Sequence, residues 1–351
     1  MIASVLTTPP GTARQSSNRG KGIAMTRIGV LGAGGMGSAV AALLHRAHPG
    51  AATVLIGRSG AHLDAITRDG LQVRPAGGAP WVATLDARPV EGVDPGSLDA
   101  LVLLTKTYDS AAAVADTAHL LAPGGVAVSL QNGLGNDLVL AGEYGGGRSL
   151  VGVTTIGAAR PAPGIVTVAQ GTVAGRSVSH VGPCGAATAP YGQARRVAAA
   201  LSAAGMPALA VTDAAAEIWA KLALAVMSPI SAVLGLTVGA LWRQPDGRAL
   251  VEAMFDEVVE VAAREGVALD RETAWTHATA TFERTGEHRT SMCNDVAAGR
   301  RTEIATMAGE VHRRGLAHGA PLPVHTTVLR MLGAVTGARA AGDGADTATG
   351  R

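Results

Sequence analysis

The chain contains 351 residues with a formal net charge of +2, and 47% of the residues are hydrophobic. This length predicts about two domains with enough apolar side chains for packed cores. A near-neutral charge with dispersed basic residues gives no indication of a nucleic-acid partner or a membrane surface. Cys184 and Cys293 lie far apart and the histidines show no metal-ligand spacing, so we expect two reduced thiols, no metal and a cytoplasmic protein.

The two ends of the chain differ in composition from the middle. Residues 1–24 are rich in Ser, Thr, Pro, Gly and Arg, and their apolar run is too short for the core of a signal peptide. We predict a disordered leader over 1–24 and a folded chain from Met25, which is also an alternative start of the protein. Residues 337–351 have a similar composition and are predicted to form a disordered tail.

The first half alternates between strand-like and helix-like segments. Apolar and β-branched runs predict strands over 27–32, 52–58, 71–75, 98–106 and 125–133. Helical patterns lie between them, over 36–47, 59–70 and 109–124. Such alternation is typical of a doubly wound parallel sheet. Residues 149–182 carry short β-branched runs separated by Gly and Pro, which predict strands at the sheet edge, partly antiparallel.

The second half is predicted to be helical, over 189–205, 246–266, 271–286, 301–319 and 324–337. After Lys221 follow 21 residues without a formal charge, which is long enough to cross a bilayer. Pro229 and several Ser, Thr and Gly residues interrupt this run, so a broken pair of core helices lining a cleft is favoured over a membrane anchor. We predict a Rossmann-type domain over 25–208 and an all-helical domain over 209–336.

A glycine motif lies between the first predicted strand and the first predicted helix. Gly32, Gly34 and Gly37 form G-x-G-x-x-G, which favours a tight turn, a close approach of the backbone to a pyrophosphate and tight helix–strand packing. The following helix offers free N–H groups to the phosphates. We expect the whole loop to bind a dinucleotide, through Gly32, Ala33, Gly34, Gly35, Met36 and Gly37.

The end of the second strand indicates which dinucleotide is bound. NAD-binding folds usually place Asp or Glu about 20 residues after the motif, where the side chain binds the ribose 2′-hydroxyl. This chain has Gly57, Arg58 and Ser59 at that place. A cation and a hydroxyl suit a 2′-phosphate, so the sequence predicts NADPH, with Arg58 at the phosphate; the alternative is an ordinary solvated arginine.

From Arg27 to about Leu332 the chain resembles the ketopantoate reductase (2-dehydropantoate 2-reductase) family. The resemblance rests on six segments in the right order: "GAGGMGS" (32–38), "LLTKTYD" (103–109), "LQNGLGN" (130–136), "IGAARPAPG" (156–164), "EIWAKLA" (217–223) and "SMCNDVAAGRRTEI" (291–304). It implies a Rossmann domain followed by a helical domain, with the active site in the cleft. It also implies reduction of the ketone of a 2-oxo acid in pantothenate biosynthesis, and a homodimer through the helical domain.

The resemblance implies roles for two residues in the chemistry of reduction. Lys221 resembles the family's general acid, which gives a proton to the developing alkoxide, a contribution of about 10²–10⁴-fold in rate. Glu303 resembles the acidic partner near the lysine and the cofactor. Without the resemblance, Lys221 is a snorkelling surface lysine and Glu303 a solvated helix residue.

Four further residues correspond to ligand contacts in the family. Lys106 and Ala158 resemble cofactor contacts, and Asn132 resembles a residue that contacts both nicotinamide and substrate. Ser291 resembles the residue that binds the substrate carboxylate. A turn asparagine and a helix N-cap are the alternative interpretations of Asn132 and Ser291.

The sequence departs from the family pattern just after Lys221. The family places asparagines four and eight residues after the lysine, followed by a proline, and a third asparagine farther along. Here Ala225 and Pro229 occupy the first two places, with one residue deleted, and Val238 lies near the third. Ser228 is the nearest polar replacement and is assigned to the substrate. A bulkier or more apolar 2-oxo acid, or another ketone or an imine, fits such an altered pocket.

Two other functions stay open from the sequence. One keeps the fold and reduces an imine or oxidises a hydroxy acid. The other is an NADPH-binding sensor without catalysis, which the presence of Lys221, Asn132 and Glu303 disfavours.

Overall fold

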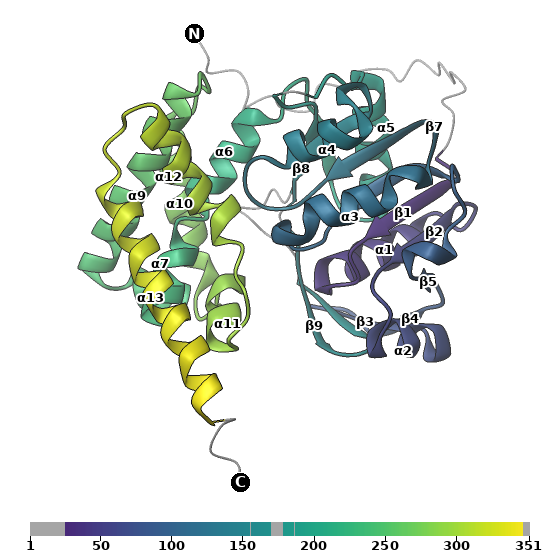
Figure 1. Ribbon diagram of the computed structural model, residues 1–351, viewed down its shortest axis with the longest axis horizontal. Helices are drawn as coiled ribbons and strands as arrows, with labels where there is room; N and C mark the ends of the chain where they lie inside the picture. The colour runs from purple at the N-terminus through teal and green to yellow at the C-terminus, as the bar shows by residue number, and fades with distance from the viewer. Residues whose placement is uncertain (1–24, 155, 170–177, 186, 347–351) are drawn as a thin grey trace.

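The computed structural model describes residues 25–154, 156–169, 178–185 and 187–346, with side chains as far as residue 338. The predicted leader (1–24) and residues 347–351 lie outside the described residues. Figure 1 shows two lobes: an α/β lobe built from the first half of the chain and a helical lobe built from the second. This arrangement confirms the predicted fold class.

An eight-stranded sheet forms the centre of the first lobe, with the strand order β12-β11-β8-β7-β6-β1-β2-β5. Its pairs are parallel except β11, which runs antiparallel to β8. The strands are Arg27–Leu31 (β1), Ala52–Ile56 (β2), Asp86–Arg88 (β5), Leu98–Leu103 (β6), Leu121–Ser129 (β7), Ser149–Val153 (β8), Ser179–Gly182 (β11) and Ala208–Ala210 (β12).

Successive residues of each central strand pack against different layers. In β6, Ala100 and Val102 join a core shared with the first and fifth helices, whereas Leu101 and Leu103 join a core that continues into the helical lobe. The helices of this lobe are Gly35–Ala47 (α1), Ala61–Asp69 (α2), Ser110–Thr117 (α3), Asn136–Tyr144 (α4) and Tyr191–Ala203 (α5). Both faces of the sheet are therefore covered, as a parallel sheet requires.

A second sheet of four strands, in the order β4-β3-β10-β9, lies beside the first. Its strands are Leu71–Pro75 (β3), Trp81–Ala83 (β4), Gly157–Ala162 (β9) and Ile165–Ala169 (β10). The prediction that all strands of 149–182 lie at the edge of one sheet was thus wrong for β9 and β10. β8 pairs on both sides inside the main sheet, and only β11 is an antiparallel strand near its edge. The short strands β4 and β5 were not predicted.

The helical lobe consists of Ala215–Leu224 (α6), Met227–Leu234 (α7), Val238–Trp242 (α8), Pro245–Arg264 (α9), Arg271–Thr285 (α10), Ser291–Ala297 (α11), Ala308–Ala317 (α12) and Pro323–Asp346 (α13). In its core, the rings of Trp242, Phe255, Trp275 and Phe282 contact one another in edge-on or tilted pairs. β12 still pairs with the main sheet at Ala210, so the domain boundary lies after this residue and not at 208. α13 continues to Asp346, so the predicted end of the fold at 336 was also wrong.

The apolar run after Lys221 forms α6, α7 and α8. One segment, Ala215–Leu234, has the length and hydropathy of a membrane span, and 61% of it is buried inside the protein. Trp219, Ala223 and Ile230 are fully enclosed in the core of the helical lobe. The turn at Ala225 and Val226 separates α6 from α7, which agrees with the predicted broken pair of core helices.

The glycine loop joins β1 to α1. Gly32 has φ +114°, and a Cβ there would lie 2.6 Å from the backbone nitrogen of Thr105. A Cβ at Gly37 would meet the carbonyl oxygen of Gly32, so helix and strand pack tightly. Gly34 is exposed and a Cβ there would meet nothing within 4 Å. Ala33 and Met36 pack under the loop against the α1 core.

The β9–β10 hairpin lies across this loop. A Cβ at Gly35 would come within 2.9 Å of Cα of Ala159, so the hairpin backbone touches the start of α1. The buried His62 of α2 ties the hairpin down, because its Nδ1 accepts from Gly164 N at 2.9 Å while its Nε2 lies 2.9 Å from Oγ of Ser38. Burial, with a smaller effect of Arg160, lowers the pKa of His62 to about 4. The ring is therefore neutral at neutral pH, as the Gly164 bond requires.

Two alanine substitutions separate the role of the loop in packing from its predicted role in binding. Gly35→Ala should lower the free energy of unfolding by about 1–3 kcal/mol, because its methyl group overpacks against the hairpin. Gly34→Ala should cost less than about 1 kcal/mol, since it adds a methyl group to open space at a helix N-cap. Gly34→Ala should nevertheless weaken dinucleotide binding. Thermal unfolding measures the change in stability of both variants, and nucleotide titration measures the change in dinucleotide binding. Unchanged dinucleotide binding by Gly34→Ala would contradict the loop's predicted role.

Candidate functional site

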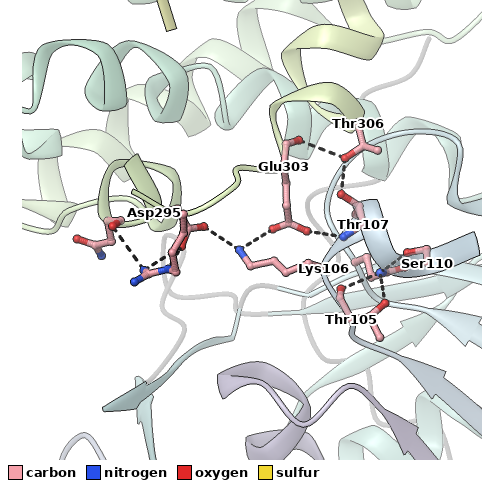
Figure 2. A network of polar contacts seen from close by, with 10 residues as sticks. Thr105, Lys106, Thr107, Ser110, Asp295, Glu303 and Thr306 are labelled. Carbon is pink, nitrogen blue, oxygen red and sulfur yellow. Dashed lines mark hydrogen bonds and ion pairs between the residues drawn. The ribbon is translucent and has the colours of Figure 1, made fainter. Parts of the chain in front are cut away.

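Lys106 connects the two lobes at the carboxyl end of β6. Its Nζ lies 2.9 Å from Oδ2 of Asp295 on α11 and 3.1 Å from Oε2 of Glu303, which precedes the 3₁₀ turn Ile304–Thr306 (η5). Figure 2 shows the lysine between these two carboxylates. The other oxygen of Glu303 accepts from Thr107 N at 2.9 Å, and the hydroxyls of Thr107 and Thr306 are 2.7 Å apart. The sheet edge is thus tied to the helical lobe by charged and neutral hydrogen bonds.

The carboxylates around Lys106 fix its charge. Burial lowers the pKa of Lys106, but Glu303 and Asp295 outweigh this effect, so the pKa lies above its usual value. Asp295 and Glu303 are both nearly buried. Asp295 also binds Arg300, whose Nε is 2.9 Å from its Oδ1. Lys106 is therefore a permanent cation at neutral pH, suited to hold an anion or a ribose hydroxyl.

Gln131 joins the ends of β6 and β7. Its buried amide donates to Thr105 O at 2.8 Å and to Oγ of Ser110 at 2.7 Å, and its oxygen accepts from Oγ of Ser129 at 2.9 Å. Thr105 and Ser110 lie close together beside Lys106 in Figure 2. This network fixes the loop after β7, and with it the next residue, Asn132.

Lys221 approaches the same region from the other lobe. It lies in the last turn of α6, half-buried, and its Nζ donates to Thr154 O at 2.7 Å, just after β8. Burial lowers the pKa of Lys221 to about 8, against an opposing attraction by Glu303. An ammonium with this pKa keeps its proton at neutral pH but gives it up far more readily than an ordinary lysine.

A cavity of about 20 Å³ lies beside Lys221, between the lobes. It is lined by Gln131, Asn132, Gly133, Val153, Ile218, Lys221, Leu222, Ala225 and Met307. A space of this size holds about one water molecule. Most of its lining residues are apolar, and Gln131, Asn132 and Lys221 are the polar ones.

The structure brings together several, but not all, of the residues predicted for substrate. Asn132 and Lys221 share the cavity, whereas Ser228 lies on α7, outside the lining. Ala225 takes the place in the wall instead. Ser291 is exposed at the first turn of α11, one turn before Asp295 and on the same face. The N-cap of α11 is Thr290, whose hydroxyl accepts from Cys293 N, so the cap interpretation of Ser291 was wrong by one residue.

The residues predicted for cofactor line the edge of the sheet from the glycine loop to Asn132. Ala158 belongs to the hairpin strand that touches Gly35. Arg58 follows β2, and its side chain is 94% exposed, with Nη2 4.0 Å from Oδ2 of Asp109. Lys106 and Glu303 lie farther along the same edge. In the parts of the chain that the structure describes, no group of three or more His, Cys, Asp or Glu residues could hold a metal ion.

Sequence reasoning missed three residues at this edge: Gln131, Asp295 and Arg160. Gln131 precedes Asn132 at the end of a predicted strand, and Asp295 follows Ser291 by one helical turn, so both positions carried a signal. Arg160 carried none, because the hairpin that brings it to the glycine loop was predicted at the edge of the main sheet. Its Nη1 lies 3.4 Å from Ala33 O.

Comparison with known proteins gives a consistent result over almost the whole folded chain. The family described as ketopantoate reductase PanE/ApbA matches residues 28–176, and its C-terminal part matches residues 213–336. The chain is 34% identical to the 2-dehydropantoate 2-reductase of Halobacterium salinarum, over 87% of this chain and 97% of the relative. It is 33% identical to the enzyme of that name from Archaeoglobus fulgidus, over 87% and 96%.

A solved structure with the same fold is that of D-mandelate dehydrogenase with NADH and anilino(oxo)acetate. The TM-score is 0.80 with 24% identity, over 89% of this chain and 99% of that one. At this identity the likeness shows the fold alone. The two family matches together, however, cover the glycine loop, the sheet edge and α6, and each relative is matched over almost its whole length. The chain therefore belongs to the ketopantoate reductase family of pyridine-nucleotide-dependent oxidoreductases, which act on a CH–OH/C=O group.

Proposed function

We propose that the protein reduces the ketone of a 2-oxo acid with NADPH and that Lys221 supplies the proton. The observation that carries this proposal is the half-buried ammonium of Lys221, with a pKa lowered to about 8, beside Asn132 in a cavity between the lobes. Ketopantoate is the first candidate substrate, because the family and the relatives above carry that name. A cytoplasmic location and a homodimer through the helical domain stay predictions.

The sheet edge has the features that a pyridine dinucleotide needs. Open space in front of Gly34 and the N-terminus of α1 suit the pyrophosphate. Arg58 suits the 2′-phosphate of NADPH. We expect Ala158, Lys106, Glu303 and Asn132 to contact the ribose and nicotinamide. The adjoining loop residues Gly32, Ala33, Gly35, Met36 and Gly37 give the turn its shape.

The chain's own groups can then complete the reduction. When bound, the reduced nicotinamide supplies a hydride to the carbonyl carbon. The ammonium of Lys221 holds a proton at Nζ and gives it to the carbonyl oxygen as negative charge develops there, so that a C–H bond and an O–H bond replace the C=O π bond. Nζ then takes up a proton from solvent.

Glu303 has two roles in this proposal. Its attraction raises the pKa of Lys221 against the effect of burial, so the lysine keeps its proton near neutral pH. It also binds Lys106 and Thr107 N, which holds η5 against the sheet edge. The cavity beside Lys221 has room for about one water molecule, so binding of a 2-oxo acid requires the lobes to part at these contacts.

The apolar wall favours a second candidate substrate, a more apolar 2-oxo acid than ketopantoate. Ala225 lines the cavity one turn after Lys221, where the family resemblance calls for an asparagine. Val238 is buried at the start of α8 and is not part of the lining. We assign the hydroxyl of Ser291 to the substrate groups that such asparagines would bind. The hydroxyl of Ser228 can take part if the lobes move apart.

A substrate panel with three proteins tests the function. Lys221→Ala should lower kcat for any 2-oxo acid that the wild type reduces by about 10²–10⁴-fold, without loss of NADPH binding. Ala225→Asn should raise kcat/KM for ketopantoate about tenfold relative to apolar 2-oxo acids, because one added hydrogen bond contributes about 1–1.5 kcal/mol. NADPH oxidation measures both. Turnover that Lys221→Ala leaves unchanged would rule out the proton-donor role.

The pH dependence of the reduction tests the roles of Lys221 and Glu303. Since the proton donor must be charged, kcat of the wild type should fall above a pH of about 8. Glu303→Gln removes the attraction that raises the pKa of Lys221, so the kcat of this variant should begin to fall at a lower pH than that of the wild type.

Asp295→Asn is the matched control, because it also removes a carboxylate from Lys106 but does not contribute to the pKa of Lys221. The kcat of Asp295→Asn should fall above the same pH as the kcat of the wild type, whatever its value at neutral pH. An equal displacement in both variants, or none in either, would contradict the assignment.

A further inference from the structure

Arg160 is a charged residue of the β9–β10 hairpin to which the proposed function gives no role. Its Nη1 lies 3.4 Å from Ala33 O in the glycine loop, and the residue is exposed. Within the described residues, no carboxylate lies within 4.0 Å of its guanidinium. The cation is therefore held at the loop by a neutral carbonyl, and its charge is available to an anion.

Three elements meet at the place to which Arg160 reaches. Ala33 lies against the end of β2, because a Cβ at Gly57 would come within 2.5 Å of its methyl carbon. The first turn of α2 carries His62, which binds the same hairpin through Gly164 N. After burial, the charge of Arg160 is the second influence that lowers the pKa of His62, so the two side chains are close. Arg160 thus stands where the glycine loop, the end of β2 and the start of α2 converge.

In Rossmann folds this convergence is where the 2′ position of the adenine ribose is recognised. Arg58 is the arginine that the sequence places there. Its side chain is 94% exposed, and its Nη2 lies 4.0 Å from Oδ2 of Asp109. Arg58 thus has a carboxylate at the limit of ion-pair distance, whereas Arg160 contacts a neutral carbonyl of the loop and has no acidic partner among the described residues.

We infer that Arg160 is a cofactor-specificity residue whose guanidinium binds the 2′-phosphate of NADPH together with Arg58. A planar guanidinium can donate two hydrogen bonds to one phosphate, which an ammonium cannot do with the same geometry. The inference rests on the proposed use of NADPH and goes beyond it, because it assigns the selection of the cofactor to the hairpin of the second sheet. NADH, which lacks the 2′-phosphate, should not depend on Arg160.

The test compares the dissociation constants of NADPH and NADH for the full chain and four variants. Arg160→Gln removes the charge, Arg160→Lys keeps the charge without the guanidinium, and Arg58→Gln removes the other arginine. Arg68→Gln is the matched control: it changes the net charge equally, but Arg68 lies at the far end of α2 and pairs with Asp69. Calorimetric titration with adenosine 2′,5′-bisphosphate and with 5′-ADP isolates the phosphate from the nicotinamide.

Arg160→Gln should weaken NADPH and adenosine 2′,5′-bisphosphate by about tenfold or more, the loss of a charge-assisted hydrogen bond, and change NADH and 5′-ADP by less than about threefold. The affinity of Arg160→Lys for NADPH should lie between the affinities of Arg160→Gln and the wild type, and Arg68→Gln should bind NADPH as tightly as the wild type. Unchanged NADPH binding in Arg160→Gln, or an equal loss of NADPH and NADH, would overturn the inference. A wild type that binds NADH as tightly as NADPH would instead contradict the proposed cofactor itself.

Discussion

The site depends on one costly arrangement, an ammonium held partly out of water between two domains. A lysine prefers to be hydrated when charged, and its burial in α6 lowers its pKa to about 8. The carbonyl oxygen of Thr154, in the sheet lobe, accepts a hydrogen bond from its Nζ, and the charge of Glu303 opposes its neutralisation. Each of these groups comes from a different part of the chain, so the pKa of Lys221 reports whether both lobes are in place.

Lysine and arginine have different roles in this protein. Lys21, Lys106 and Lys221 are its three lysines, and two of them lie at the carboxyl edge of the sheet where it faces the helical lobe. An ammonium can be tuned by burial and by carboxylates, whereas a guanidinium stays charged in any protein environment. The environments of the two lysines are opposite in effect: carboxylates raise the pKa of Lys106, and burial lowers that of Lys221. Lys106 is thereby suited to hold a ligand, and Lys221 is suited to transfer a proton.

The family resemblance pointed to Lys106, Lys221 and Glu303, whereas local sequence patterns predicted the glycine loop and most strands of the main sheet. Each of these depends on residues close together in sequence, such as the spacing of Gly32, Gly34 and Gly37. The β9–β10 hairpin was misplaced because its partner, β3, lies about 90 residues earlier, and nothing in its own composition identifies that partner. Arg160 was missed for the same reason. The positions of Asp295 and Gln131 carried a signal in the sequence, but their contacts with Lys106 and Thr105 lie across the chain, and a local pattern does not contain such contacts.

The most direct measurement is an NMR titration of the lysine side chains in protein labelled with ¹³C-lysine. Three lysines give a simple spectrum, and Lys106→Arg and Lys221→Arg assign the signals. We expect the Lys221 signal to titrate near pH 8 and the Lys106 signal to titrate above the ordinary pKa of a lysine. A Lys221 signal that titrates near 10.5 would show a hydrated surface lysine and contradict the proposed proton donor.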